Sequence, residues 1–302
     1  MTDSFERHAA NPLITAADLP YPANTVFNAG AADLGDEILL LLRVEGRSGR
    51  SHLTVARSKN GLDAWRFETP PILHPDDGDV LEEYGLEDAR ITRLEDDGVW
   101  AMTFTDYSRY GPAVALATSP DFRAIDRKGV LLPPNNKDAA LFPRTFDGRY
   151  ALLHRPTGRE EGMWIAYSPD LIHWGDHRPL LSPRPGAAWD SRKVGVGPQP
   201  IETDAGWLVI YHGVKQTGSG LLYRVGVLLL DRDDPSRLIG RSKGWLFGPE
   251  APYERAGDVP NAVFPCGAFV RDGTVWMYYG AADTSICLAT ASLDDLIAAA
   301  TG

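Results

Sequence analysis

The sequence predicts an all-β protein, a five-bladed β-propeller, and three observations lead to that prediction. A pair of strands joined by a turn rich in Asp and Gly recurs five times along the 302 residues. A third strand follows each pair, and short apolar segments with a proline close behind, such as PPILHP at residues 70–75, supply a fourth. The copies start about every 50 to 60 residues, which is close to the period of propeller blades with four strands each.

The hairpins are the elements that carry this prediction. Each turn contains residues that adopt a positive φ readily, as a tight hairpin requires. The turns are Gly35-Asp36, Asp97-Gly98, Asp147-Gly148, Ala205-Gly206 and Asp272-Gly273. We predict one domain over residues 1–302, with hairpin cores at about 26–46, 86–108, 139–156, 195–214 and 263–283.

The two ends of the chain complete one repeat between them. The fifth copy has no fourth strand of its own, because the chain ends soon after Leu296. The segment Asn11 to Ile14 has the missing apolar character, so we expect the N-terminal strand to complete the last blade and leave no exposed edge. Helix is expected only after Leu293 and around Leu62. A two-sheet sandwich is the alternative fold, and five equal repeats argue against it.

Composition narrows the function classes. The net charge of −11 disfavours nucleic acid or an anionic membrane as the partner. Apolar runs are too short for a membrane helix, and the polar segment Met1 to Ala10 does not resemble a signal peptide. Cys266 and Cys287 form no framework or metal pattern and are expected to be buried free thiols. A cytoplasmic location is therefore expected.

Polar side chains recur at equivalent positions of the repeats. The start of the first strand and the end of the second lie at the same end of a hairpin, so a ring gathers them at one mouth of its channel. The residues at these positions are Asn28, Arg43, Asp88, Asp106, Lys137, Arg155, Lys193, His212 and Asp283. Blades three and four supply the cations, and Tyr223 begins the adjacent strand. A carboxylic acid opposite cations suits protonation of a leaving group while an anion attacks.

Each of these residues also has a structural alternative. Asp88 can pair with Arg90, Arg43 and Arg155 can join blades as ion pairs, and His212 can be a buried histidine. Only their convergence at equivalent positions favours a functional site.

Motifs along the whole chain carry a resemblance to a known family. They are NPLIT, VFNAGA, LLRVEGR, YGLEDARIT, NKDAALFPR, LLHRP, WDSRKVGVGPQPI, GWLVIYHGV, YRVGVLLLD and MYYGAADT. Together they resemble glycoside hydrolase family 130, which comprises mannoside phosphorylases and related hydrolases. Members are five-bladed propellers, in agreement with the repeat count.

The resemblance implies roles for the residues at the mouth. Asp88 would be the catalytic acid. The substrate-binding residues would be Asn28, Arg43, Glu87, Arg90, Asp283 and Tyr107. The phosphate-binding residues would be Lys137, Arg155, Lys193, His212 and Tyr223. Two positions depart from the family pattern: Ala89 stands where proline is common, and Lys137 where some members have arginine. Tyr110 joins Tyr107 as a candidate to stack on the acceptor sugar.

The implied activity is inverting phosphorolysis of a β-mannoside, either mannobiose or a mannooligosaccharide, by inorganic phosphate. The product would be α-D-mannose 1-phosphate. Because phosphate attacks in place of water, no second carboxylate is needed as a base. In the family the acid is thought to act through the 3-hydroxyl of the sugar. To donate a proton at neutral pH, Asp88 would need a pKa raised by burial against the pull of the cations.

Other functions remain open at this point. The alternatives are an inverting β-mannoside hydrolase on the same scaffold, an arabinanase- or fructosidase-like hydrolase with three carboxylates, and a non-catalytic glycan-binding propeller. The cations fit the three-carboxylate class poorly. We expect no metal and no cofactor beyond phosphate as co-substrate, and no nucleic acid or membrane partner. Family members often assemble, which leaves a homo-oligomer open.

Overall fold

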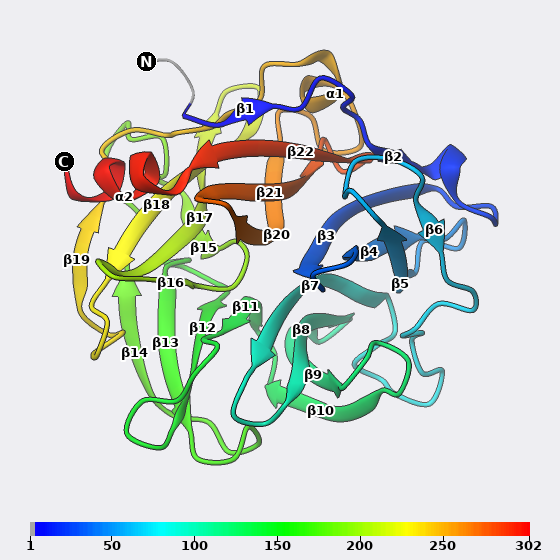
Figure 1. Cartoon of the computed structure of the whole chain (residues 1–302), viewed down its shortest axis with the longest axis horizontal. Coiled ribbons are helices and arrows are strands. Elements are labelled where there is room, and N and C mark those ends of the chain that lie inside the picture. Colours follow the sequence, from blue (N-terminus) through cyan, green and yellow to red (C-terminus); the bar gives the residue numbers. More distant parts are fainter. Residues whose placement is uncertain (1–3) are drawn as a thin grey trace.

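The computed structural model describes residues 4–302, so Met1 to Asp3 of the predicted domain lie outside the described part. It is an all-β structure in which groups of antiparallel strands surround a common centre (Figure 1). Few helical segments accompany the strands. They are a 3-10 helix at Ala16–Asp18 and the α-helices α1 (Pro252–Arg255) and α2 (Leu293–Thr301).

The strands fall into four hydrogen-bonded sheets. The first sheet joins both ends of the chain and contains β1 (Glu6–Arg7), β2 (Ile14–Thr15), β20 (Val263–Arg271), β21 (Thr274–Ala281) and β22 (Ser285–Ser292). The second contains β3 (Thr25–Asp33), β4 (Ile38–Glu45), β5 (Ser51–Ser58), β6 (Arg66–Phe67), β7 (Gly85–Leu94), β8 (Val99–Ser108), β9 (Gly111–Ser119) and β10 (Asp126–Leu132). The third contains β11 (Asn136–Leu141), β12 (Tyr150–Pro156), β13 (Met163–Ser168) and β14 (Gly175–Leu181). The fourth contains β15 (Lys193–Val196), β16 (Ile201–Thr203), β17 (Gly206–Thr217), β18 (Gly220–Leu230) and β19 (Leu238–Arg241).

The eight-stranded sheet contains two of the five predicted repeats. They are joined by a single parallel pair, Ser51 with Gly85. Gly85 has φ +114°, and a Cβ there would lie 2.4 Å from the Ser51 backbone. Only glycine therefore allows the two repeats to touch edge to edge at this point. Apart from this contact, each predicted repeat is a separate antiparallel group.

The apolar core lies between consecutive groups of strands. Five clusters of buried residues occur within residues 4–302, and each draws its members from two neighbouring groups, including the last group with the first. Successive residues of a strand point to opposite faces, so the side chains of one strand pack into two different clusters. In β17, Leu208 and Ile210 pack toward the C-terminal group, whereas Trp207 and Val209 pack toward the preceding one. Five cores of this kind do not fit a two-sheet sandwich, which has a single core.

Local predictions can be compared with the structure directly. The predicted turns contain residues of positive φ, including Gly35, Gly98 and Gly206, which confirms them as turns. The helix after Leu293 is present as α2. The helix expected around Leu62 is wrong, because the Asn60 side chain accepts hydrogen bonds from the backbone N–H groups of Leu62 and Asp63 and holds a turn instead.

The ends of the chain pair as expected. Ile14 and Thr15 pair antiparallel with β22, so an N-terminal strand joins the C-terminal group. The proline-flanked fourth strands are less uniform. The segments at 129–134 and 178–183 fall largely within β10 and β14, but PPILHP contributes only the bridge between Leu73 and Leu53.

Two further sequence predictions bear on the chain's environment. Cys266 and Cys287 are free and buried, and burial raises the pKa of the Cys287 thiol to about 12. Among residues 4–302, no helix combines the length and the apolar character needed to cross a membrane.

Candidate active site

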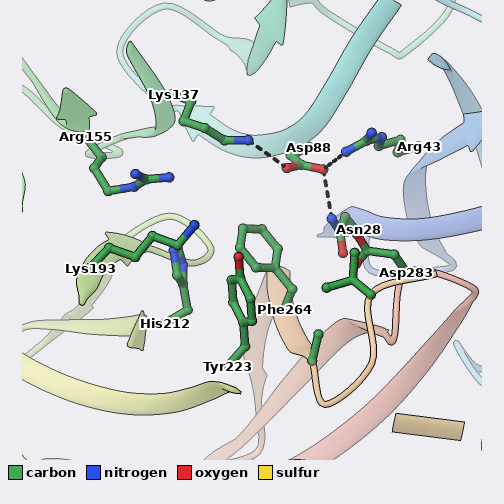
Figure 2. Close-up of a pocket in the computed structure, with 12 residues that line it drawn as sticks. Asn28, Arg43, Asp88, Lys137, Arg155, Lys193, His212, Tyr223, Phe264 and Asp283 are labelled. Carbon is green, nitrogen blue, oxygen red and sulfur yellow. Dashed lines mark hydrogen bonds and ion pairs between the residues drawn. The ribbon is translucent and has the colours of Figure 1, made fainter. Parts of the chain in front are cut away.

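A cavity of about 110 Å³ lies where the inner strands converge. Its lining residues come from all five groups of strands and are Asn28, Arg43, Asp88, Lys137, Arg155, Lys193, His212, Tyr223, Val259, Ala262, Phe264 and Asp283. Figure 2 shows Arg155, Lys193 and His212 gathered on one side, Arg43, Asn28 and Asp283 on the other, and Lys137 and Asp88 between them. The structure therefore brings together nine of the residues that the sequence placed at the mouth.

Backbone bulges aim several of these side chains inward. The pairing of β3 with β4, of β7 with β8 and of β11 with β12 shifts register at Phe27/Gly30, Glu87/Arg90 and Lys137/Ala140. Within these bulges Asn28, Asp88 and Asp138 have φ of 50°, 51° and 49°. Asn and Asp tolerate this left-handed conformation better than most residues, which accounts for their use at the bulged position.

Asp88 is held by donors on two sides. It is only 2% exposed. Its Oδ1 accepts hydrogen bonds from Asn28 Nδ2 at 2.9 Å and from Arg43 Nη1 at 3.0 Å, and its Oδ2 lies 4.0 Å from Lys137 Nζ. Arg43 is itself fixed, because its Nε donates to Ser51 Oγ at 3.0 Å. The carboxylate is thus positioned before any ligand binds.

The two cavity carboxyl groups have opposite pKa shifts. Burial favours the neutral form of Asp88, but the charges of Arg43, Lys137 and Arg90 and the Asn28 hydrogen bond outweigh it and lower the pKa. Burial and the neighbouring negative charge of Asp88 raise the pKa of Asp283 to about 7. The raised pKa that the proposed role of Asp88 requires is therefore not found among these protein groups, because the cations lie so close.

The cationic side of the cavity is suited to an anion. Arg155 is 2% exposed and lines the cavity from β12. Lys193 lies 5.2 Å above the Tyr223 ring and has no carboxylate partner among residues 4–302. Lys137 stays protonated, because Glu87, Asp138 and Asp88 outweigh its burial and raise its pKa. Guanidinium and ammonium groups form charge-assisted hydrogen bonds with phosphate or carboxylate oxygens.

His212 lies below the cations and is fully buried. Its ring packs on Phe264 with centroids 4.5 Å apart. Burial, together with the charges of Arg155 and Arg90, lowers its pKa to about 4 despite the opposing effect of Asp138. His212 is therefore neutral at pH 7 and offers the cavity an uncharged ring nitrogen.

Three residues with predicted binding roles do not line the cavity, nor does Asp106, which the repeats also place at the mouth. Glu87 accepts from Arg43 Nη2 at 2.8 Å and so supports the lining from below. Arg90 is 1% exposed and donates to the backbone carbonyls of Asp88, Val196 and Gly197, which ties the group of β7 to the group of β15. Tyr107 is 39% exposed and packs edge-on against Tyr84 outside the cavity.

Sequence reasoning missed two kinds of residue. Phe264 contributes an apolar wall, for which the sequence held no signal beyond its position in a strand. Asp138 is fully buried under the cations. A signal for it did exist: Asn28-Ala29, Asp88-Ala89 and Asp138-Ala139 are the same motif in three successive repeats.

Fold and site together define an all-β protein with a polar cavity that sets a buried carboxyl group beside a cluster of cations. Comparison with known proteins makes the assignment specific. The family model for glycoside hydrolase family 130, described as β-1,4-mannooligosaccharide phosphorylase, matches residues 8–301. The chain therefore belongs to glycoside hydrolase family 130.

Individual relatives agree with this assignment. The chain is 41% identical to the 1,2-β-oligomannan phosphorylase of Thermoanaerobacter sp. (strain X514), over 82% of this chain and 80% of that protein. The structure of β-1,2-mannobiose phosphorylase from Listeria innocua, in complex with β-1,2-mannobiose, superposes with a TM-score of 0.90 at 32% identity over 98% and 99% of the two chains. A structure from work on family members that are glycoside hydrolases targeting β-1,2-mannosidic linkages in Candida mannan has a TM-score of 0.85 at 28% identity, covering 96% of this chain and 94% of that one.

Proposed function

We propose that this protein is an inverting β-mannoside phosphorylase that transfers a mannosyl group from a mannobiose or mannooligosaccharide to inorganic phosphate. The observation that carries the proposal is the group of cations around His212, in which Lys193 has no carboxylate partner among the described residues. A hydrolase needs a carboxylate base near its attacking water, whereas a phosphorylase needs donors for phosphate. The phosphorylase relatives support the same conclusion.

In this mechanism a phosphate oxygen attacks the anomeric carbon on the face opposite the leaving group. The carbon–oxygen bond to the acceptor sugar breaks as the new bond forms, and the β-mannoside becomes α-D-mannose 1-phosphate. Asp88 supplies the proton that the departing oxygen takes up, directly or through the sugar 3-hydroxyl. Asn28, Arg43 and Asp283 bind the mannosyl group, and Lys137, Arg155, Lys193, His212 and Tyr223 bind phosphate.

Phosphate binding would also raise the pKa of Asp88. The charge of Lys137 helps to lower that pKa. A bound phosphate dianion brings negative charge to the same cations and opposes their effect on Asp88. We therefore propose that phosphate entry raises the pKa of Asp88 and so prepares the acid for donation.

The acceptor sugar belongs on the side of the loops before β7 and after β8. Tyr84 and Tyr107 are exposed there, and Tyr110, which is 59% exposed, lines a second hollow of about 350 Å³ together with Glu83 and Arg109. Exposed aromatic rings beside fixed polar groups suit a sugar, which presents both apolar faces and hydroxyl groups. We propose Tyr107 and Tyr110 as acceptor-binding residues.

Three broader proposals accompany the activity. The cyclic arrangement of the five cores supports a single five-bladed propeller over residues 1–302, closed by the N-terminal strand on β22. The free buried thiols favour a cytoplasmic location. We further propose that the reaction needs no cofactor beyond phosphate as co-substrate.

The activity is tested by incubating the protein with β-1,2- and with β-1,4-linked mannobiose, each with and without inorganic phosphate. Mannose 1-phosphate should form only with phosphate, and NMR of the product should show the α anomer. The variant Lys193→Met, which keeps the side-chain length but loses the charge, should need more phosphate for half-maximal rate. Equal turnover to free mannose in phosphate-free buffer would replace the proposal with hydrolysis.

A further inference from the structure

Asp138 is a buried carboxylate that the proposed mechanism does not use. It is fully buried and does not line the cavity. It occupies the bulge of β11, at the position that Asp88 occupies in β7. The two residues therefore have the same local backbone, but the Asp138 carboxylate lies beneath the cations rather than at the cavity.

Asp138 contacts two arginines and the neutral His212 ring, which come from three strand groups. Its Oδ2 accepts a hydrogen bond from Arg155 Nε at 2.8 Å and lies 2.7 Å from Arg155 Nη2. The same oxygen is 3.4 Å from His212 Nε2, and Oδ1 is 3.5 Å from Arg90 Nη2. These contacts hold its pKa well below the usual range against the effect of burial, so the group is ionised at neutral pH.

The geometry at Arg155 decides which of its donors reach the cavity. Asp138 faces Nε and one terminal nitrogen, and Glu161 accepts a hydrogen bond from the other terminal nitrogen. A guanidinium has five N–H groups, so both terminal nitrogens retain an N–H for another partner. Arg155 therefore keeps one N–H on each terminal nitrogen and lines the cavity, where these N–H groups can form charge-assisted hydrogen bonds with an anion.

We propose that Asp138 is the positioning residue of the phosphate subsite, where it fixes the Arg155 guanidinium and the His212 ring so that phosphate finds them already oriented. The proposal rests on the proposed phosphorylase function. Its physical basis is preorganisation: without Asp138, only Glu161 would hold the Arg155 side chain, which would then populate more rotamers that phosphate would have to order on binding.

The test is the variant Asp138→Asn, assayed for phosphorolysis of whichever mannobiose the wild type cleaves. We expect the KM for phosphate to rise about 10- to 100-fold, as for the loss of a well-ordered charged contact. The KM for the mannoside should change less than about threefold on the same energy scale. Calorimetric titration with inorganic phosphate alone should show the same loss of affinity.

Asp190→Asn is the matched control. Asp190 is also fully buried and accepts from Arg184, Arg241 and Tyr211 at 2.6–2.9 Å, but neither Asp190 nor these three partners line the cavity. The variant Asp190→Asn should lower the midpoint of thermal unfolding, as Asp138→Asn does, but it should leave the KM for phosphate unchanged. A purely structural role for Asp138 predicts that the two variants behave alike.

A double variant keeps the proposal testable if Asp138→Asn does not fold. Asp138→Asn with Arg155→Gln removes both buried charges and so leaves neither unpaired. We expect its KM for phosphate to exceed that of Arg155→Gln alone by less than the 10- to 100-fold effect expected of Asp138→Asn in the wild type, because only the His212 ring is then left for Asp138 to position. Additive effects, or a folded Asp138→Asn with wild-type phosphate KM, would overturn the positioning role. If the wild type itself shows no dependence on phosphate, the proposed function fails instead.

Discussion

The two halves of the cavity handle buried charge in different ways. On the sugar side, the charged groups neutralise one another at the cavity surface: Arg43 contacts both Glu87 and Asp88. On the opposite side, Arg155 is paired from behind, by Asp138 and Glu161, and Lys193 has no carboxylate partner within residues 4–302. One half therefore presents a nearly balanced surface to a neutral sugar, and the other leaves donors free for an anion.

This difference shows how a repeated backbone produces two kinds of site. Asp88 and Asp138 each lie in the bulge of their own strand, and both have a positive φ and are buried. The neighbouring groups of strands place Arg43 and Asn28 around the first, and Arg155 and His212 around the second. The local backbone of Asp88 and Asp138 is thus the same, and the side chains that distant strands bring to each carboxylate make their surroundings different.

The largest expected effect comes from removing the acid of the sugar half. Asp88→Asn keeps the shape and the contacts with Arg43 but cannot donate a proton, so kcat should fall about 10²- to 10⁴-fold. An aryl β-mannoside whose leaving group needs no protonation should lose much less in the same steady-state assay. An equal loss with both substrates would show that Asp88 binds the sugar rather than protonating the leaving group.

A pair of glycine variants separates the two halves. A Cβ at Gly280 would lie 2.0 Å from Asn28 Oδ1, and one at Gly195 would lie 2.6 Å from His212 Cε1 and 2.8 Å from Asp138 Oδ2. Gly280→Ala should therefore raise the KM for the mannoside, and Gly195→Ala the KM for phosphate, each about 10-fold, since small displacements of binding groups cost about this much. Steady-state kinetics with each substrate varied in turn give both values. If both variants raised both constants equally, the two halves would not be separate.

The smallest effect concerns Asp106, a buried carboxyl group that forms no ion pair with any of residues 4–302. Asp106 lies opposite Leu86 on β8, and burial, with the charges of Glu82 and Asp79, raises its pKa to about 8. In the unfolded chain this group loses its proton near pH 4, so between pH 4 and 8 the folded state binds more protons and stability falls as pH rises. Asp106→Asn removes this loss.

Thermal unfolding of Asp106→Asn and wild type across this pH range tests the prediction. The two proteins should be similar near pH 4, and the variant should gain roughly 1–3 kcal/mol by pH 8. A stability difference that did not change with pH would mean that Asp106 has an ordinary pKa. The catalytic constants should stay close to wild type, because Asp106 does not line the cavity.

By itself the sequence determined the strand repeats, the turns and the ends of strands at which polar side chains gather. These are local properties: alternation, residues that accept positive φ, and the spacing of copies place Asn28 and Asp88 at equivalent positions. Lys137 lies one residue before the corresponding position, which Asp138 occupies. The cavity residues found in this way lie together, although they are as far apart in sequence as Asn28 and Asp283.

Only the tertiary structure decided what surrounds each of these groups. It placed Arg90 on backbone carbonyls rather than in the cavity, and put Asp138 beneath the cations. It also lowered the pKa of Asp88 and raised that of Asp283. Burial and charge–charge distances depend on side chains brought in by distant strands, so no local pattern in the sequence contains them.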